Sequence, residues 1–182
     1  MAAKKKARTK RPPAPRKPAT RNGKAKKVDP IPKGMHTLTP ALAVKDANAA
    51  LKFYKEAFGA KELYRLSEPG GKIGHAEMMI GDSLIMLGEE YPDMKLFAAD
   101  HYGGSPIRLN IAVKNVDKAF ERAVAAGAEV ARPVENQFYG WRSGIVKDPL
   151  GYHWFISSQI EEVSPKQMQK RWDKMMSEAR PA

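Results

Sequence analysis

The chain has 182 residues, no cysteine and a formal net charge of +12. This length suits one domain with a hydrophobic core plus terminal extensions, and the lack of cysteine excludes disulfides and thiolate metal sites. No apolar run reaches the roughly 18 residues of a membrane span, and the charged N-terminal segment does not resemble a signal peptide. We therefore expect a soluble, cytoplasmic protein.

The positive charge is concentrated at the N-terminus. Residues 1–33 hold 13 of the 32 basic residues and one of the 20 acidic residues, which leaves 19 of each sign in the rest of the chain. The same segment holds 6 of the 14 prolines and no aromatic residue, a composition that predicts a disordered tail. Such a tail either binds nucleic acid non-specifically, with nucleoid or nuclear association, or serves as a solubilising extension.

Regular structure is predicted from residue 37 onward. Alternating apolar and small or polar residues at 37–45 predict a strand. Asp46 is a candidate N-cap for a helix that Gly59 ends. Three more strands are expected at 60–66, 73–80 and 83–87, separated by glycine-containing turns. This order corresponds to a βαβββ unit.

The same pattern then begins again. Val44-Lys45-Asp46 matches Val113-Lys114-Asn115 at an offset of 69 residues, and Gly59-Ala60 matches Gly127-Ala128 at 68. The second copy comprises a strand at 107–113, a helix capped by Asn115 or Asp117, and strands at 129–133, 143–147 and 152–157. Internal repetition at this length indicates two copies of one unit and hence an α+β fold.

Two segments lie outside the repeats. Residues 91–106 are long for a plain connection, so a lid, a partner contact and an ordinary crossover are all open. Residues 161–182 predict a C-terminal amphipathic helix that starts at Ser164 and Pro165. We expect its apolar stripe to pack on its own domain, with a dimer interface or a membrane surface as alternatives. The stripe contains Met168, Trp172, Met175, Met176 and Ala179.

Several motifs within the repeats resemble one known family. They are Val44-Lys45-Asp46, Ala50-Leu51-x-Phe53-Tyr54, Phe58-Gly59-Ala60, Gly74-His75-Ala76-Glu77, Gln137-Phe138-Tyr139-Gly140 and Asp148-Pro149-x-Gly151-Tyr152-His153-Trp154. Together with the repeat they resemble the vicinal oxygen chelate superfamily, also called glyoxalase/bleomycin-resistance/dioxygenase proteins, and especially its PhnB-like branch. The resemblance implies a glyoxalase-like domain at 34–160, with modules at 37–90 and 107–158. It also implies a mixed β-sheet curved into a ligand-binding cup with helices outside, and a homodimer.

The resemblance also locates the positions at which metal-using members bind a divalent ion. These positions hold Thr39, Arg108 and Phe155 here, with Met86 as the approximate fourth. A hydroxyl, a guanidinium, a phenyl ring and a thioether do not form an oxygen and nitrogen site, and the arginine would repel the ion. We therefore expect no metal cofactor, although displaced ligands remain the alternative.

Strand alternation indicates what the cup presents to a ligand. Thr39, Ala41 and Ala43 share one face, and Arg108 shares another with Asn110. Small residues leave room, while a guanidinium and an amide suit an anionic or carbonyl group. We predict an apolar, aromatic pocket with one positive anchor.

Three polar residues are candidates for chemistry. His75 and Glu77 lie two residues apart and so point to one face of a strand. Three roles are open for this pair: a general base with its hydrogen-bonding partner, two ligands of an unusual metal site that His153 completes, or a structural hydrogen-bonded pair. A salt bridge to Glu77 is also the structural alternative for Arg108.

The aromatic residues near the second repeat's last hairpin allow similar alternatives. Trp141 and Arg142 either clamp a planar ligand or form a cation–π pair with each other. Tyr139 and Trp154 are core, rim or ligand-binding residues, and Trp154 should point away from Phe155.

Three functions follow from these observations. The first is binding of a small organic molecule without the usual metal, either for sequestration, as in bleomycin-resistance members, or for a metal-independent reaction that uses His75, Glu77 or His153. The second is a metal-dependent lyase or isomerase of glyoxalase type with displaced ligands. The third is a nucleic-acid-associated protein that acts through residues 1–33.

Overall fold

A computed structural model describes residues 28–32 and 34–178. The chain divides into two units, residues 1–30 and residues 31–182, and the helices and strands of the described residues all belong to the second. The predicted tail lies, apart from residues 28–32, outside the described residues. No helix in the described part of the chain is both long and apolar enough to cross a membrane.

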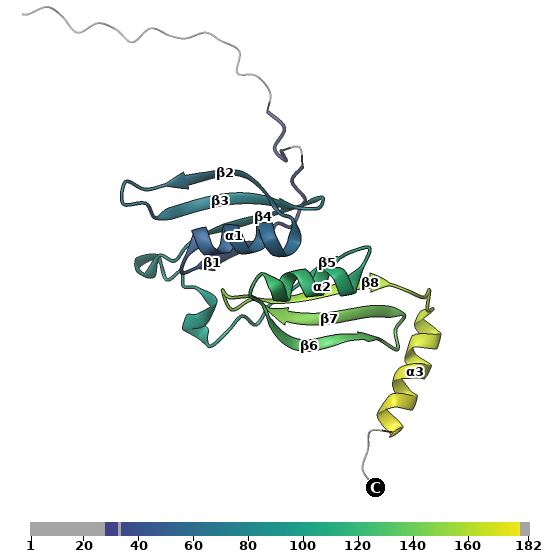
Figure 1. The fold of residues 1–182 in the computed structure, drawn as a ribbon. Helices are drawn as coiled ribbons and strands as arrows, with labels where there is room; N and C mark the ends of the chain where they lie inside the picture. The colour runs from purple at the N-terminus through teal and green to yellow at the C-terminus, as the bar shows by residue number, and fades with distance from the viewer. Residues whose placement is uncertain (1–27, 33, 179–182) are drawn as a thin grey trace, which may run out of the picture. The chain divides into compact units, whose positions relative to one another are not determined.

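Module 1 is the first βαβββ unit, shown in blue and teal in Figure 1. Its elements are β1 (Ala41–Val44), α1 (Ala47–Phe58), β2 (Lys61–Ser67), β3 (Ile73–Ile80) and β4 (Ser83–Glu89). The sheet order is β1-β4-β3-β2. The β1–β4 pair is parallel and the other pairs are antiparallel, so the sheet is mixed. β1 is one of its two edge strands.

Module 2 repeats this arrangement. Its elements are β5 (Arg108–Ala112), α2 (Val116–Ala125), β6 (Glu129–Asn136), β7 (Trp141–Lys147) and β8 (His153–Gln159). The sheet order is β5-β8-β7-β6, again with a parallel pair at the edge strand, here β5. The predicted α+β fold of two βαβββ modules is confirmed.

The predicted helix signals are present in both modules. The Asp46 side chain accepts a hydrogen bond from the Ala49 amide at 2.9 Å, and Gly59 ends α1 at a φ of 67°. In module 2 the Asn115 side chain accepts from the Lys118 amide at 3.0 Å, so Asn115 caps α2 and Asp117 does not.

The first strand is shorter than predicted. It begins at Ala41, and residues 37–40 are not part of the sheet. Leu38 is 85% exposed, and the Thr39 hydroxyl donates to the His36 carbonyl at 3.4 Å. The alternating pattern predicted a strand from residue 37, but Leu38 does not pack on the core, so the pattern overestimated the length of the strand.

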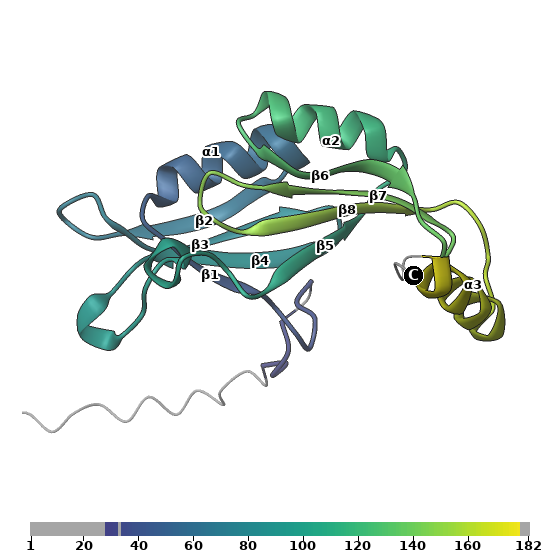
Figure 2. The same cartoon turned by 90° about the horizontal axis from the view of Figure 1, so that it is seen from below.

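One hydrophobic core joins the two modules. Helices α1 and α2 contact each other and lie side by side over their sheets (Figure 2). Tyr54 and Phe58 of α1 pack against Trp154 of β8, with ring centroids 5.3 and 4.5 Å from the indole. Each sheet therefore has one face on this core and an opposite face, called here the open face.

The connection between the modules is an ordered crossover with two short 3-10 helices, η1 (Pro92–Met94) and η2 (Ala99–Tyr102). Ala98 and Ala99 are buried. The Ala98 amide donates to the Glu90 carboxylate at 3.1 Å, and Lys45 pairs with Asp100 at 3.2 Å. These contacts fix the segment against module 1.

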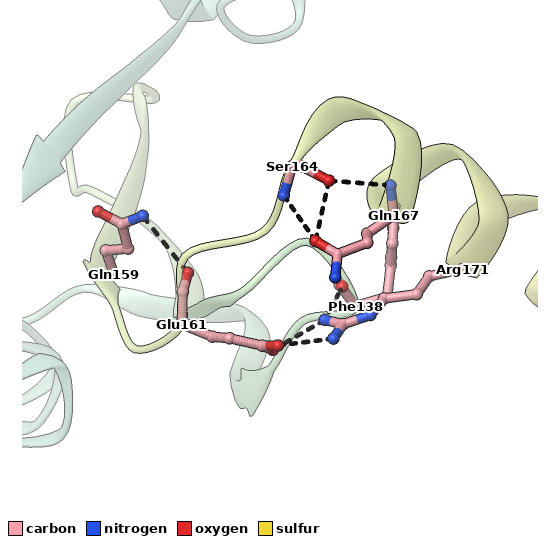
Figure 3. Close-up of polar contacts among 6 residues, drawn as sticks. All are labelled: Phe138, Gln159, Glu161, Ser164, Gln167 and Arg171. Carbon is pink, nitrogen blue, oxygen red and sulfur yellow. Dashed lines mark hydrogen bonds and ion pairs between the residues drawn. The ribbon is translucent and has the colours of Figure 1, made fainter.

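The C-terminal helix α3 (Pro165–Glu178) is held at its base by polar contacts (Figure 3). The Gln167 amide donates to the Ser164 hydroxyl and the Ser164 amide to the Gln167 side chain, at 3.3 and 3.1 Å, which is a capping box. Arg171 forms two hydrogen bonds to Glu161, at 2.8 and 2.6 Å, and one to the Phe138 carbonyl at 2.9 Å.

The predicted packing of the apolar stripe on its own domain is largely wrong. No residue of α3 is buried. Trp172 does contact the Phe138 ring, with centroids 5.4 Å apart, but it remains 44% exposed. Ala179, the last predicted member, lies outside the described residues.

Candidate functional site

A cleft of about 1010 Å³ is lined by β1 and β5, one edge strand from each sheet. The Pro40–Leu42 segment and Arg108–Val113 contribute to its walls, and Phe58 and Trp154 contribute aromatic rings. The crossover between the modules supplies Phe97, Ala99 and Tyr102. Most of these lining side chains are apolar, as expected for a small-molecule site.

Two arginines line this cleft, Arg108 and Arg122, and Arg122 donates to the Ala57 carbonyl at 2.6 Å. Arg108 is exposed. Among the described residues its guanidinium has no carboxylate within ion-pair distance and no hydrogen bond. The proposed salt bridge to Glu77 is therefore wrong, because the Glu77 carboxylate accepts from Tyr64 instead, at 2.7 Å. Asn110, two residues along β5, also lines the cleft and accepts from the Ser157 hydroxyl at 3.0 Å.

The open face of module 1 carries a polar cluster of Tyr64, His75 and Glu77. Ala76 and Met78, which alternate with His75 and Glu77 along β3, are fully buried in the core, so His75 and Glu77 point to the open face. The His75 Nε2 lies 3.3 Å from both the Tyr64 hydroxyl and the Glu77 carboxylate. The hydrogen bond to Glu77 raises the pKa of the Tyr64 phenol, because it stabilises the protonated form.

Sequence reasoning placed His75 and Glu77 together but missed Tyr64. Tyr64 is the cross-strand partner of Glu77, and Leu66 is that of His75. The register between β2 and β3 contains irregularities, so this pairing is not visible in the sequence. Met86 is the partner of Glu77 on the other side and also lies on the open face.

The residues at the family's metal positions do not fit a divalent ion. Thr39 lies before β1 and bonds to a backbone carbonyl, and Met86, Arg108 and Phe155 offer a thioether, a guanidinium and a ring. His153 belongs to β8 of module 2 and does not complete a site with His75 and Glu77. Within residues 28–32 and 34–178 no three His, Asp or Glu side chains are grouped closely enough to hold a metal.

Phe155 lies on the open face of module 2, opposite to the buried Trp154, as alternation predicted. The Arg132 guanidinium stands over the Phe155 ring, 5.3 Å from its centroid, and donates to the buried Ser143 hydroxyl at 2.9 Å. The Arg132 Nε is enclosed and has no hydrogen-bond partner among the described residues. Sequence reasoning gave Arg132 no role, because its approach to Phe155 crosses two strand pairings.

The predicted relation between Trp141 and Arg142 is wrong. They are adjacent on β7 and leave it on opposite faces. Arg142 bonds to both carboxylate oxygens of Asp117 and to Asn136, and this pairing lowers the pKa of Asp117. Arg142 thus neither clamps a ligand together with Trp141 nor stacks on it.

Two other aromatic predictions have clear outcomes. Trp154 is a core residue, 1% exposed, and its indole N–H donates to Asp148 at 2.8 Å. Tyr139 lies in the turn before β7, edge-to-face with Phe138 at 5.1 Å. Neither Tyr139 nor Thr39 is among the residues that line the cleft.

Asp148 has a structural role that its turn motif did not reveal. It is 2% exposed and accepts four hydrogen bonds, from the amides of Leu150 and Tyr152, the Trp154 indole and the Tyr54 hydroxyl, at 2.8 to 2.9 Å. Burial raises the pKa of Asp148, and the four donors oppose that rise.

Comparison with known proteins agrees with this fold. The profile of the Glyoxalase/Bleomycin resistance protein/Dioxygenase superfamily matches residues 35–156. An uncharacterised protein of Mycobacterium bovis is 39% identical over 135 residues, which span 72% of this chain and 89% of the relative. An uncharacterised protein of Mycobacterium tuberculosis is equally similar, with 79% of its length covered.

Solved structures show the same architecture. TioX from Micromonospora sp. ML1 is 25% identical, with 71% of this chain and all of TioX (100%) covered and a TM-score of 0.53. A glyoxalase/bleomycin resistance protein/dioxygenase family enzyme from Burkholderia phytofirmans is 23% identical, with 66% and 96% of the two chains covered and a TM-score of 0.54. The profile match and the shared fold together show that this chain belongs to the Glyoxalase/Bleomycin resistance protein/Dioxygenase superfamily.

Proposed function

We propose that this protein binds a small, largely apolar organic molecule with an anionic or carbonyl group, without a metal at the family's usual position. The observation that carries the proposal is the cleft of about 1010 Å³, which combines apolar walls with the unpaired guanidinium of Arg108. A buried ligand oxygen needs a hydrogen-bond donor, because an unpaired polar group costs free energy on leaving water. Arg108 supplies that donor and the opposite charge.

The residues at the metal positions support binding without an ion. In metal-using enzymes the ion polarises the oxygen atoms of the substrate. Here Arg108 occupies one of those positions and offers a fixed positive charge of its own. A guanidinium orients and neutralises an oxygen group but generates no metal-bound nucleophile, which favours binding over metal-dependent lyase or isomerase chemistry.

We also propose that the protein acts as a homodimer, a common state in this family. Leu66 and Tyr64 on the open face of module 1 are 60% and 45% exposed, and the edge strands of each described sheet have one side without a strand partner. A second copy would cover apolar surface of this kind and pair such edges.

The proposal is tested with 8-anilinonaphthalene-1-sulfonate, an aromatic anion whose fluorescence increases in apolar sites. Full-length protein should bind this probe saturably, and Arg108→Ala should weaken binding by about tenfold or more, the effect of losing one charge-assisted hydrogen bond. Lys118→Ala, which removes one positive charge from α2, is the matched control and should bind like the wild type.

Two outcomes would contradict the proposed function. One is the absence of saturable probe binding to the folded wild-type protein. The other is equal affinity of Arg108→Ala and Lys118→Ala, which would show that Arg108 is not the anchor. A native mass spectrum of protein purified gently from its source adds a direct reading of any bound molecule, any metal and the subunit number. A stoichiometric divalent ion in that spectrum would overturn the metal-free part of the proposal.

A further inference from the structure

Three basic side chains form a row across the open face of module 2. Arg108 of β5 is in register with His153 of β8, and His153 is in register with Lys147 of β7. In-register residues on adjacent strands point to the same face, about 4.8 Å apart. Phe155, two residues after His153, also faces this side. We call Arg108, His153 and Lys147 the basic row.

The charges of the basic row are poorly compensated. Lys147 lies 3.7 Å from Glu129 of β6, whose side chain is 77% exposed. Within the described part of the chain, the Arg108 and His153 side chains have no carboxylate partner and no hydrogen bond. Within the described residues, the Arg108 guanidinium is therefore available to pair with an anion that lies over the row.

The next positions along the same strands form an aromatic and apolar surface beside the basic row. Asn110, Phe155 and Ile145 follow the basic row, one residue pair further along the same three strands. Arg132 stands over the Phe155 ring and adds a further cation beside the row. A ligand with its anion on the row would therefore meet an aromatic surface next to it. Arg108 belongs both to the row and to the wall of the cleft.

We propose that the basic row binds a phosphate or phosphonate group of a small molecule whose apolar part lies against Phe155 and in the cleft. This inference rests on the proposed function and specifies its ligand class. A carboxylate carries one charge and would neutralise one member of the row. A phosphoryl group carries up to two charges and three acceptor oxygens, which match two permanent cations and an imidazole that donates in either protonation state.

The test compares three probes on the full-length protein by calorimetric titration at neutral pH and physiological salt. Phenyl phosphate is mostly doubly charged, benzoate is singly charged, and N-phenyl-1-naphthylamine is neutral and reports the apolar cleft alone. Phenyl phosphate should bind about tenfold or more tightly than benzoate. Lys147→Met, which keeps the apolar stem, and Arg108→Ala should each weaken phenyl phosphate binding by about tenfold. Lys118→Met is the matched control and should have no effect.

Amide chemical shifts distinguish phenyl phosphate binding at the basic row from binding at the basic N-terminal tail. Phenyl phosphate should shift the backbone amide resonances of β5, β7 and β8 in the wild type, and the same shifts in Lys147→Met should require about tenfold more phenyl phosphate. The tail is identical in all variants, so its contribution cancels when two variants are titrated with the same probe.

The outcomes distinguish the two proposals. If the neutral probe binds but phenyl phosphate binds no better than benzoate, or Lys147→Met keeps wild-type affinity, the basic row is overturned and the proposed function stands. If the neutral probe also fails to bind the folded protein, both proposals are overturned.

Discussion

The Tyr54 hydroxyl donates a hydrogen bond of 2.9 Å to the Asp148 carboxylate and thereby joins the helix of module 1 to the last turn of module 2. Two further bonds cross the same boundary. Tyr152 donates to the Ala43 carbonyl at 2.8 Å, and Arg122 to the Ala57 carbonyl at 2.6 Å. The two modules that line the cleft are thus joined by these hydrogen bonds as well as by apolar packing.

Tyr54→Phe should lower the free energy of unfolding by about 1–3 kcal/mol, because it removes one donor from a buried carboxylate without creating a large cavity. Chemical denaturation followed by circular dichroism measures the change. Tyr102→Phe is the control, since Tyr102 is 64% exposed, and it should stay within about 0.5 kcal/mol of the wild type. Equal stabilities of the two variants would show that the Tyr54–Asp148 bond contributes nothing measurable.

Gly88 of β4 lies directly against the backbone of β3. A Cβ at Gly88 would overlap sterically with the Gly74 carbonyl oxygen and force the two strands apart. Gly88→Ala should therefore cost about 1–3 kcal/mol, the usual range for overpacking. Gly70→Ala is the matched control, because a Cβ there meets nothing within 4 Å. The comparison is by thermal and chemical denaturation, and a Gly88→Ala protein as stable as Gly70→Ala would contradict this close approach.

Glu62 should stabilise the protein at neutral pH and lose this effect in acid. Hydrogen bonds from Arg65 and Lys55 lower the pKa of Glu62 from 4.5 to about 2. Between these values the unfolded chain binds more protons than the folded one, so stability rises with pH in this range and the Glu62 contribution is complete above it. The contribution disappears as the pH falls through about 2.

The comparison of wild type with Glu62→Gln tests this pH dependence. The wild type should be more stable by roughly 0.5–1 kcal/mol at neutral pH, since the ion pairs are partly exposed, and the difference should shrink steadily in acid. Glu56→Gln is the control, because Glu56 lies 4.0 Å from Lys52 on the exposed side of α1, and it should have a smaller effect. A difference that is constant with pH would exclude Glu62 as the titrating group.

The sequence predicted the elements of this protein much better than its contacts. Helix ends depend on local chemistry, so Asp46 and Gly59 identified α1 from neighbouring residues alone. By contrast, the position of Arg132 over Phe155 depends on strand register across β6, β7 and β8. Register is set by the whole sheet and by bulges, which periodicity does not reveal.

The same reasoning explains which site predictions were correct. His75 and Glu77 were paired correctly because strand alternation is local, whereas Tyr64 comes from another strand and was missed. Asp148 was assigned only to a turn, since its partner Tyr54 lies 94 residues away. The prediction that Trp141 and Arg142 act together failed because adjacent residues on a strand point to opposite faces.

Glu77→Gln should lower the pKa of Tyr64, since the carboxylate that accepts its hydrogen bond raises that pKa. An alkaline titration followed by phenolate absorbance measures this, and the difference between wild type and variant should correspond to one tyrosine that ionises at lower pH. Glu68→Gln is the informative control, because Glu68 accepts a hydrogen bond from Tyr91 and raises the pKa of that phenol instead. The double variant should show two shifted tyrosines. A Glu77→Gln titration identical to the wild type would mean that Tyr64 does not donate to Glu77 in solution, and that the polar cluster on the open face of module 1 is not preformed.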